Sequence, residues 1–229
     1  MLKKWNDLPD SFKNPEVNFY YEILNKKRAQ LFFKRLFDIL ISLILLILLS
    51  PIMIIIAISI KLDSKGPVFF RQRRITQYGK TFRIFKFRTM VENAEKLGSQ
   101  VTVSNDPRVT KIGGFIRKYR IDEFPQLLNV LFGDMTFVGT RPEVKKYVDA
   151  YTNEMLATLL LPAGITSEAS IKYKDEQRLL SSSADADKTY IEEILPEKMK
   201  YNLRGIEKTS IKYDLSIMLA TVFGVLRWN

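Results

Sequence analysis

The stretch that decides the fold is residues 39–60, which read ILISLILLILLSPIMIIIAISI. This run carries no charge, and a straight helix of its length would measure roughly 33 Å, enough to cross a bilayer core of about 30 Å. Pro51 complicates that interpretation, because a proline inside a helix removes one hydrogen bond and clashes with the preceding turn. The Ser50-Pro51 pair therefore predicts either a kinked membrane span or a re-entrant hairpin that enters and leaves through one face of the membrane.

The charges on the two sides of this run are balanced. Five Lys or Arg residues lie within the fifteen positions before it, and five lie within the fifteen positions after it. A spanning helix usually has an excess of Lys and Arg on its cytoplasmic side, whereas a hairpin with both ends in the cytoplasm should be basic at both. Proline is also tolerated in spanning helices, so the residues alone leave the two forms at even odds.

The composition limits the chemistry that this chain can perform. Its 229 residues suit one domain and a membrane element, and its net charge of +11 indicates phosphate-bearing partners, lipid headgroups first. Cys and His are absent, which excludes thiolate nucleophiles, disulfides, Cys-based metal sites and histidine general bases. The apolar run begins too far along the chain to be a signal peptide, so we expect the bulk of the protein in the cytoplasm.

The rest of the chain predicts an α+β fold that is mostly helical. Alternating residues and turn signals indicate two short strands over 68–75 and 81–90, and a third lies within 133–142. Residues 181–183 predict a polar loop. The apolar body of the last predicted helix is too short to span a membrane, so it is either buried or lies flat on the membrane surface. Helical spacing covers residues 91–97, 107–120, 121–132, 143–160, 189–202 and 211–228.

Two adjacent carboxylates, Asp122 and Glu123, are the candidates for catalysis. They follow the basic residues Arg117, Lys118 and Arg120 and begin another predicted helix. One interpretation is structural, because Asp is a routine helix N-cap and a Glu beside it complements the helix dipole. The other is functional, because a helix start surrounded by basic residues attracts anions, and a carboxylate there could attack a phosphate or hold a divalent cation.

Basic residues supply the candidates for phosphate binding. The alternation in residues 81–90 predicts one strand face with Arg83, Lys86 and Arg88, which is either a solvated surface or a phosphate clamp. Arg141 lies in a predicted turn. The sequence has neither a G-x-G-x-x-G nor a Walker pattern, so Rossmann and P-loop nucleotide sites are not indicated.

Six motifs, in this order, resemble those of the bacterial sugar transferases, the monotopic phosphoglycosyl transferases. They are KRLFD at 34–38, SP at 50–51, KFRTM at 86–90, DEFPQLLNV at 122–130, GDM at 133–135 and VGTRP at 138–142. The resemblance covers residues 32–166 and resumes in the last predicted helix. After residue 160 the chain departs from the family, whose R-P-G-I-T-G pattern reads LPAGITS here, and this bears on contacts with the sugar and uridine more than on phosphoryl chemistry.

The resemblance implies a specific reaction. A phospho-sugar would move from a UDP-sugar to polyprenyl phosphate, such as undecaprenyl phosphate, giving polyprenyl-diphospho-sugar and UMP at the start of surface glycan assembly. Asp122 would attack the β-phosphorus and form a covalent intermediate, and Glu123 would assist the incoming lipid phosphate. The two carboxylates would also hold Mg²⁺. Charge on the diphosphate would be neutralised by Lys86, Arg88, Arg117 and Arg141.

The same resemblance favours the re-entrant hairpin, hinged at Ser50 and Pro51, with both ends in the cytoplasm. It implies an N-terminal lead over residues 1–31, a re-entrant membrane helix over 32–62, and a cytoplasmic catalytic domain over 63–229 with amphipathic interfacial helices and short strands. The protein would contact membrane lipids on the cytoplasmic face of the bacterial inner membrane, with no nucleic acid as partner. Homo-oligomerisation is left open.

Two other functions are compatible with the residues. The basic charge suits a membrane-anchored scaffold or a nucleic-acid-binding protein, but the aromatic residues follow the apolar pattern and form no evident stacking platform. A conventional glycosyltransferase would release UDP, so the nucleotide product separates it from a phosphoglycosyl transferase.

Overall fold

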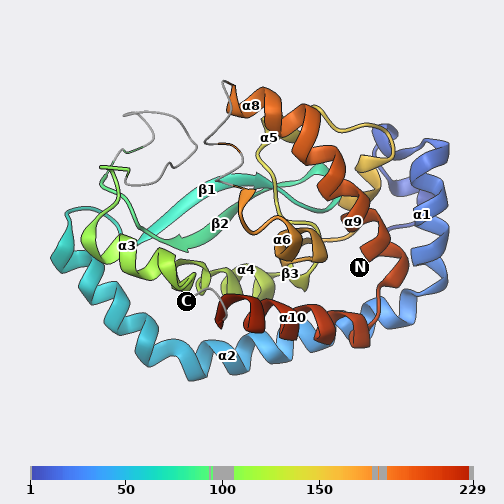
Figure 1. Ribbon diagram of the computed structural model, residues 1–229. Helices are drawn as coiled ribbons and strands as arrows, with labels where there is room; N and C mark the ends of the chain where they lie inside the picture. The colour runs from blue at the N-terminus through green and yellow to red at the C-terminus, as the bar shows by residue number, and fades with distance from the viewer. Residues whose placement is uncertain (1, 93, 95–105, 177–179, 181–184, 227–229) are drawn as a thin grey trace.

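The computed structural model describes residues 2–92, 94, 106–176, 180 and 185–226. The described chain is mostly helical with two small sheets, so the predicted α+β class is confirmed (Figure 1). The predicted loop over 181–183, most of the predicted helix over 91–97 and the end of the predicted C-terminal helix lie outside the described residues.

The longest helix, α2 (Arg28–Asp63), contains the apolar run and continues through Pro51. It bends near its middle, so that both of its ends turn upward toward the rest of the molecule (Figure 1). Pro51 has no N–H to offer the carbonyl of Ile47, and the Ser50 hydroxyl donates to that carbonyl instead, at 2.8 Å. The helix is therefore bent but continuous through the Ser50-Pro51 pair, because the serine beside the proline supplies a substitute hydrogen bond.

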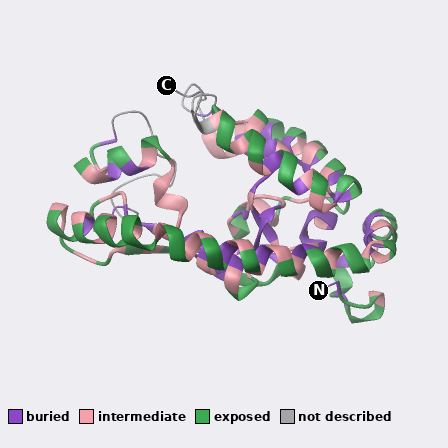
Figure 2. Cartoon of the chain, turned by 90° about the horizontal axis from the view of Figure 1, so that it is seen from below, coloured by how far each residue is buried: buried purple, intermediate pink, exposed green. Residues whose placement is uncertain are grey.

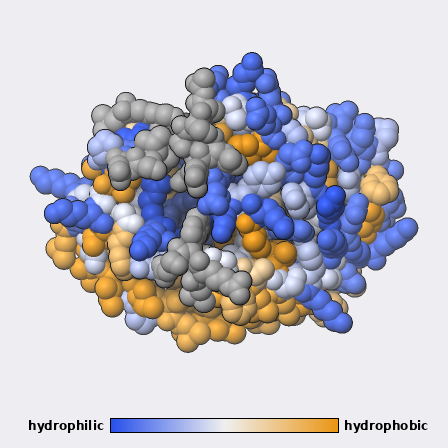
Figure 3. All heavy atoms as spheres, viewed as in Figure 1, coloured by the Kyte–Doolittle hydropathy of each residue, from blue (hydrophilic) through white to orange (hydrophobic). Residues whose placement is uncertain are grey.

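One side of the molecule is apolar and uncovered. Within the described chain, α2 alone is long and apolar enough to cross a membrane, and its most apolar window is only 11% buried, unlike a core helix. Helix α10 (Ile211–Leu226) adds the exposed side chains of Leu215, Leu219, Val222 and Phe223. Figure 2 shows α2 from below, largely exposed, and Figure 3 shows apolar residues along the lower edge with hydrophilic residues above. The fold thus separates an apolar side from a polar side.

Strands β1 (Phe69–Ile75) and β2 (Thr81–Phe87) form an antiparallel hairpin where two strands are predicted, joined through η3 (Gln77–Gly79). Arg83 stands opposite Arg73, and Lys86 stands opposite Phe70. Because side chains alternate along a strand, Arg83 and Lys86 lie on opposite faces of the hairpin, and Arg88 lies beyond the end of β2. The prediction of a single basic face is therefore wrong.

A second sheet pairs β3 (Met135–Val138) with β4 (Ala163–Thr166), in parallel. The sequence analysis predicts β3, within residues 133–142, but it does not predict β4, which follows the predicted helix over 143–160. That helix is absent, since the structure there has only α5 (Lys145–Val148) and η6 (Met155–Leu160). Two glycines allow the close strand approach, because a Cβ on Gly164 would lie 2.2 Å from the backbone of Gly139.

Most other predicted helices are confirmed. The predicted helix over 121–132 is divided into η5 (Ile121–Glu123) and α4 (Gln126–Phe132), and Pro125 occupies the N-cap position of α4. The remaining helical elements are η1 (Trp5–Asp7), η2 (Asp10–Phe12), α1 (Pro15–Lys26), α3 (Lys111–Lys118), η5 (Ile121–Glu123), α4 (Gln126–Phe132), α6 (Glu168–Lys172), α8 (Ala186–Thr189), η7 (Tyr190–Ile194) and α9 (Leu195–Lys208).

The N-terminal segment packs onto this body. Helix α1 contacts α9 and η6, and its buried Val17, Tyr20 and Leu24 share one apolar cluster with Leu160 and Leu203. Residues before the apolar run therefore belong to the folded unit and help to hold α9 in place.

Three charged side chains fasten the first part of α2 to the rest of the fold. Each lies in the KRLFD motif, and each reaches a different element. Their partners are Asp214 of α10 for Lys34, the Val130 carbonyl of α4 at 2.6 Å for Arg35, and the Thr136 hydroxyl of β3 at 2.6 Å for Asp38. The apolar helix is therefore tied by specific polar contacts to α4, the helix that follows the carboxylate pair.

Candidate functional site

The carboxylate pair lies in η5, between α3 and α4. The chain reaches it through Arg120, whose φ of 54° lies in the left-handed region. The N-cap position of α4 is Pro125, and the Asp122 carboxylate accepts no hydrogen bond from any described residue. The structural interpretation of Asp122 as a helix N-cap is therefore wrong. Its carboxylate is open in the sense that it has no hydrogen-bond partner among the described residues.

Glu123 is held by two cations from distant parts of the chain. Its Oε1 accepts from Lys86 Nζ at 2.9 Å and from Arg141 Nη2 at 2.5 Å, and its Oε2 accepts from Arg141 Nη1 at 3.4 Å. The Glu123 side chain is only 13% exposed, so solvent screens these contacts weakly. Burial opposes its ionisation, but Arg141 and Lys86 outweigh burial and hold the Glu123 pKa well below its usual range.

Asp122 has the opposite electrostatic character. Burial, and next the charge of Glu123, raise the pKa of Asp122 to about 6, against the opposing effects of Lys86, Arg117 and Arg141. One carboxylate of the pair is thus fixed as an anion, while its neighbour titrates just below neutral pH. Such divergence between adjacent acids is typical of catalytic sites.

The structure brings together most of the predicted basic residues but not all of them. Lys86 and Arg141 meet at Glu123, and Arg117, in the last turn of α3, lies close enough to lower the Asp122 pKa. Arg88 lies apart: its buried guanidinium donates to the carbonyls of Ser64 and Lys65 after α2, both at 2.7 Å. The predicted hinge pair, Ser50 and Pro51, lies within α2.

A buried amide beside the pair was missed from the sequence. Gln126 is 1% exposed, and neither polar atom of its side chain has a partner within the described chain. Asn129, one turn later, donates to the Arg83 carbonyl and accepts from the Phe85 N–H, so it joins α4 to β2. Polar residues at these spacings in an apolar helix face were the available signal.

A second buried network includes Glu143, which follows Arg141 by two residues. Lys198 donates to Glu176 at 2.7 Å and to the Tyr190 hydroxyl at 2.9 Å, and that hydroxyl donates to Glu143. Glu123 foremost, with help from Glu143 and Glu176, raises the pKa of Arg141, so this residue stays charged. These residues come together only through the fold, and no sequence motif predicts them.

The donor chemistry fits the Mg²⁺ that the family resemblance implies. The oxygens of Glu123 already accept from Lys86 and Arg141, whereas the Asp122 carboxylate is open. Groups of three or more Asp, Glu, His or Cys suited to a metal do not occur among the described residues. Mg²⁺ usually takes one or two carboxylates and completes its shell with substrate phosphates, so Asp122, beside Glu123, with a bound diphosphate would hold it.

Comparisons with known proteins agree on one family. The family described as bacterial sugar transferase matches residues 29–228. A UDP-N-acetylgalactosamine-undecaprenyl-phosphate N-acetylgalactosaminephosphotransferase of Aeromonas hydrophila is 38% identical over 198 residues, which is 85% of this chain and 44% of that protein. A UDP-glucose:undecaprenyl-phosphate glucose-1-phosphate transferase of Klebsiella pneumoniae is 41% identical over 197 residues, 83% of this chain and 39% of that protein. The chain thus spans less than half the length of these two relatives.

Proposed function

Because this chain belongs to the bacterial sugar transferase family, we propose that it transfers a phospho-sugar from a UDP-sugar to a polyprenyl phosphate. The relatives are named for UDP-N-acetylgalactosamine or UDP-glucose and for undecaprenyl phosphate. The observation that carries the proposal is the carboxylate pair, in which an open Asp122 adjoins a Glu123 held by Lys86 and Arg141. The site lies in the same body as an uncovered apolar helix, so a soluble nucleotide and a lipid could both reach it.

In the proposed reaction, an Asp122 oxygen attacks the β-phosphorus of the UDP-sugar. The bond between that phosphorus and the bridging oxygen breaks, and UMP leaves with the bridging oxygen. A phosphate oxygen of the polyprenyl phosphate then attacks the same phosphorus, which frees the Asp122 carboxylate and gives polyprenyl-diphospho-sugar. A pKa of about 6 leaves Asp122 ionised at neutral pH and more basic than an ordinary aspartate.

The neighbouring residues supply charge and position. Hydrogen bonds to Glu123 already hold the charged groups of Lys86 and Arg141 in position at the site. These two side chains would therefore need to move little when a diphosphate binds. Arg117 adds positive charge near Asp122. When bound, Mg²⁺ would neutralise further charge on the diphosphate.

The nucleotide product tests this proposal. We expect the full chain, in nanodiscs that contain undecaprenyl phosphate, to release UMP from at least one member of a panel of UDP-sugars. Without the lipid phosphate, UMP release should stop at about one UMP per protein molecule, because the covalent intermediate on Asp122 can be discharged only by the lipid phosphate. Release of UDP would indicate a conventional glycosyltransferase, and salt-sensitive nucleic-acid binding without any turnover would favour the scaffold hypothesis.

We further propose that α2 is a re-entrant helix in the bacterial inner membrane, with both ends on the cytoplasmic face. Contacts at its two ends support this, because one polar body binds both. Arg35 and Asp38 bind α4 and β3 near its start, and at its end Asp63 accepts from the Ile112 N–H of α3 at 3.1 Å. A helix that crossed the bilayer would carry these two sets of contacts to opposite faces.

Labelling of single cysteines tests this topology, since the chain has no cysteine of its own. Lys26→Cys and Lys65→Cys introduce thiols at exposed positions before and after α2. We expect a membrane-impermeant maleimide to label both variants in inverted vesicles and neither in intact spheroplasts. If the two sites label from opposite sides, α2 is a kinked span and the hairpin is wrong.

A further inference from the structure

The two ends of α2 reach the two helices that flank the carboxylate pair. Asp122 and Glu123 lie in η5, with α3 before them and α4 after them. Both helices lie along α2, α3 beside its second half and α4 beside its first half (Figure 1). Because the backbone of η5 continues into α3 on one side and toward α4 on the other, the placement of these two helices sets where the two carboxylates lie.

At its end, α2 supplies a cap to the start of α3. The first N–H groups of a helix have no partner inside the helix, and a carboxylate near them also complements the positive end of the helix dipole. Asp63, the last residue of α2, accepts from the Ile112 N–H in the first turn of α3 at 3.1 Å. Apolar residues strengthen this contact, since one cluster contains Ile56 and Ile60 of α2 with Ile112 and Ile116 of α3.

Near its beginning, α2 supplies the opposite cap to the end of α4. The last carbonyls of a helix lack partners inside it, and the helix dipole is negative there. Arg35 donates to the carbonyls of Val130 and Leu131, at 2.6 and 2.9 Å. Another apolar cluster contains Ile41 and Leu45 of α2 with Leu127 and Val130 of α4. An acid and a base of α2 thus cap the two ends of residues 111–132, the segment that carries the carboxylate pair.

The segment between the two caps contains a strained residue. Arg120, directly before η5, has φ 54° and ψ 23°, in the left-handed region that a residue with a Cβ rarely adopts. Such a conformation persists only where the surrounding contacts impose it. The caps from α2 are contacts of this kind, because they hold the helices on both sides of Arg120.

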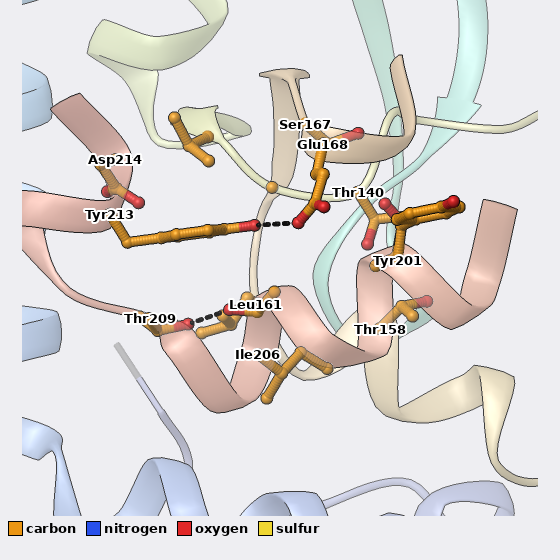
Figure 4. Close-up of a pocket in the computed structure, with 14 residues that line it drawn as sticks. Thr140, Thr158, Leu161, Ser167, Glu168, Tyr201, Ile206, Thr209, Tyr213 and Asp214 are labelled. Atoms are coloured by element: carbon orange, nitrogen blue, oxygen red, sulfur yellow. Dashed lines mark hydrogen bonds between the residues drawn. The ribbon is translucent and has the colours of Figure 1, made fainter. Parts of the chain in front are cut away.

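The neighbouring contact of Lys34 serves a different part of the fold. Lys34 forms a buried ion pair with Asp214 of α10. Tyr213, beside Asp214, donates to Glu168 of α6 at 3.4 Å (Figure 4). These contacts join α2 to α10 and α6, so Lys34 does not belong to the two caps.

We propose that Arg35 and Asp63 are positioning residues for phosphoryl transfer, because together they hold α3 and α4 so that Asp122 and Glu123 meet the substrate. This inference rests on the proposed function. It concerns the rate of the chemical step more than the binding of the nucleotide, because the cations proposed to bind the diphosphate come from β2 and from the segment after β3. Neither cap reaches those two segments.

Arg35→Ala and Asp63→Ala test this assignment in the full chain, in nanodiscs that contain undecaprenyl phosphate. A misplacement of about 1 Å can cost about 100-fold in rate, so we expect each substitution to lower kcat by about 30-fold or more. The dissociation constant of UMP should stay within about threefold of the wild-type value. The number of UMP-binding sites per chain should also stay the same, which separates a positioning role from unfolding.

The double variant tests whether the two caps act on one segment. If they do, release of either end frees it, so the double variant should have a kcat within about threefold of the lower single variant. If the two losses instead multiply, to about 1,000-fold, the caps act independently and the shared positioning role is overturned.

A conservative variant tests whether the contact with α3 is responsible. Asp63→Asn keeps an oxygen that can accept from the Ile112 N–H, and Asn caps helices about as well as Asp does. We therefore expect Asp63→Asn to keep kcat within about threefold of the wild-type value. A loss as large as that of Asp63→Ala would overturn the role of this contact.

Two matched controls remove similar contacts elsewhere. Asp185→Ala removes the cap at the start of α8, where the Asp185 side chain accepts from a backbone N–H at 3.0 Å. Arg28→Ala removes an arginine of α2 that donates to the carbonyls of Leu2 and Lys3, both at 3.2 Å. Both variants should keep kcat within about twofold of the wild-type value, because neither contact involves α3 or α4.

The outcomes separate this inference from the proposed function. If wild-type protein turns over a UDP-sugar and both Arg35→Ala and Asp63→Ala keep kcat within about twofold, the positioning role is overturned and the proposed function stands. A fall in the number of UMP-binding sites that matches the fall in kcat would show that the caps only stabilise the fold, and would overturn the positioning role as well. Absence of wild-type turnover with every UDP-sugar overturns both.

Discussion

Asp122→Asn should lower phospho-sugar transfer by about 1,000-fold or more and at the same time stabilise the fold. The amide cannot act as the nucleophile, and loss of a nucleophile typically has an effect of this size. Stability changes in the other direction because the folded state raises the Asp122 pKa from 3.8 to about 6. A raised carboxyl pKa means that the folded state prefers the protonated form, so ionised Asp122 costs folding free energy.

The pH dependence of this stability gain identifies its cause. The wild-type protein loses the contribution of protonated Asp122 as pH rises through the window from 3.8 to about 6. At pH 8 we expect the variant to be more stable by about 2 kcal/mol, since each pKa unit is worth about 1.4 kcal/mol and partial exposure reduces the total. Below pH 4 the difference should vanish. Thermal unfolding in detergent at the two pH values measures it.

Asp149→Asn is the matched control for this substitution. Asp149 is exposed and pairs with Lys145 one helical turn earlier, at 2.6 Å, so its loss should change stability by less than about 0.5 kcal/mol and leave transfer intact. Undiminished turnover in Asp122→Asn would remove Asp122 from the role of nucleophile. Equal stability of wild type and variant at pH 8 would contradict the raised pKa.

The local chemistry of the sequence predicts the β-hairpin of β1 and β2, the long apolar helix α2 and the carboxylate pair. Each depends on residues that are close in sequence: turn residues between alternating strands, an uncharged run, and adjacent acids near basic residues. The hinge also follows from neighbours, because the Ser50 hydroxyl donates to the carbonyl that Pro51 leaves without a donor. The family motifs in turn mark Lys86 and Arg141, which the fold brings to one carboxylate.

The helix predicted over residues 143–160 is absent from the structure, and it shows the limit of prediction from local spacing. Its apolar residues do recur at helical spacing, but they pack into two different clusters. Val148 and Leu156 pack with the cluster that contains α1, whereas Tyr147 and Met155 pack with the cluster around Tyr190. The helical spacing of these apolar residues therefore results from contacts with two separate clusters and not from one helix face. The path of the chain between the two clusters is set by the parallel pairing of β4 with β3, which no local pattern in the sequence encodes.

The candidate site was predictable in its residue types but not in its pairing. Arg88 follows the same alternating segment as Lys86, yet the end of β2 at Phe87 places the two in different surroundings. Gln126 can be recognised only once its burial is known, because the sequence does not show that both polar atoms of its side chain are buried without a partner, an arrangement that costs stability. Long-range contacts therefore decide which of the basic residues serve Glu123.

Glu123→Gln should move the pH profile of transfer as well as reduce its rate. In wild-type protein, kcat/KM should fall about tenfold per pH unit below the Asp122 pKa of about 6, because the nucleophile becomes protonated. Glu123 is one cause of that raised value, and Lys86, Arg117 and Arg141 remain to oppose it once the charge is removed. We therefore expect the acid limb to shift down by about one pH unit.

The rate at the optimum should fall by about 100-fold in the same variant, because a neutral amide no longer fixes Lys86 and Arg141 for the diphosphate. Glu197→Gln, the same exchange on the surface of α9, should change neither the rate nor the limb. The two readouts separate two roles of one carboxylate. A rate loss with the limb still near pH 6 would show that Glu123 positions the cations without acting on Asp122, whereas a shifted limb with full rate would show the reverse. Both changes together are what the shared contacts of Glu123 with Lys86 and Arg141, beside an open Asp122, lead us to expect.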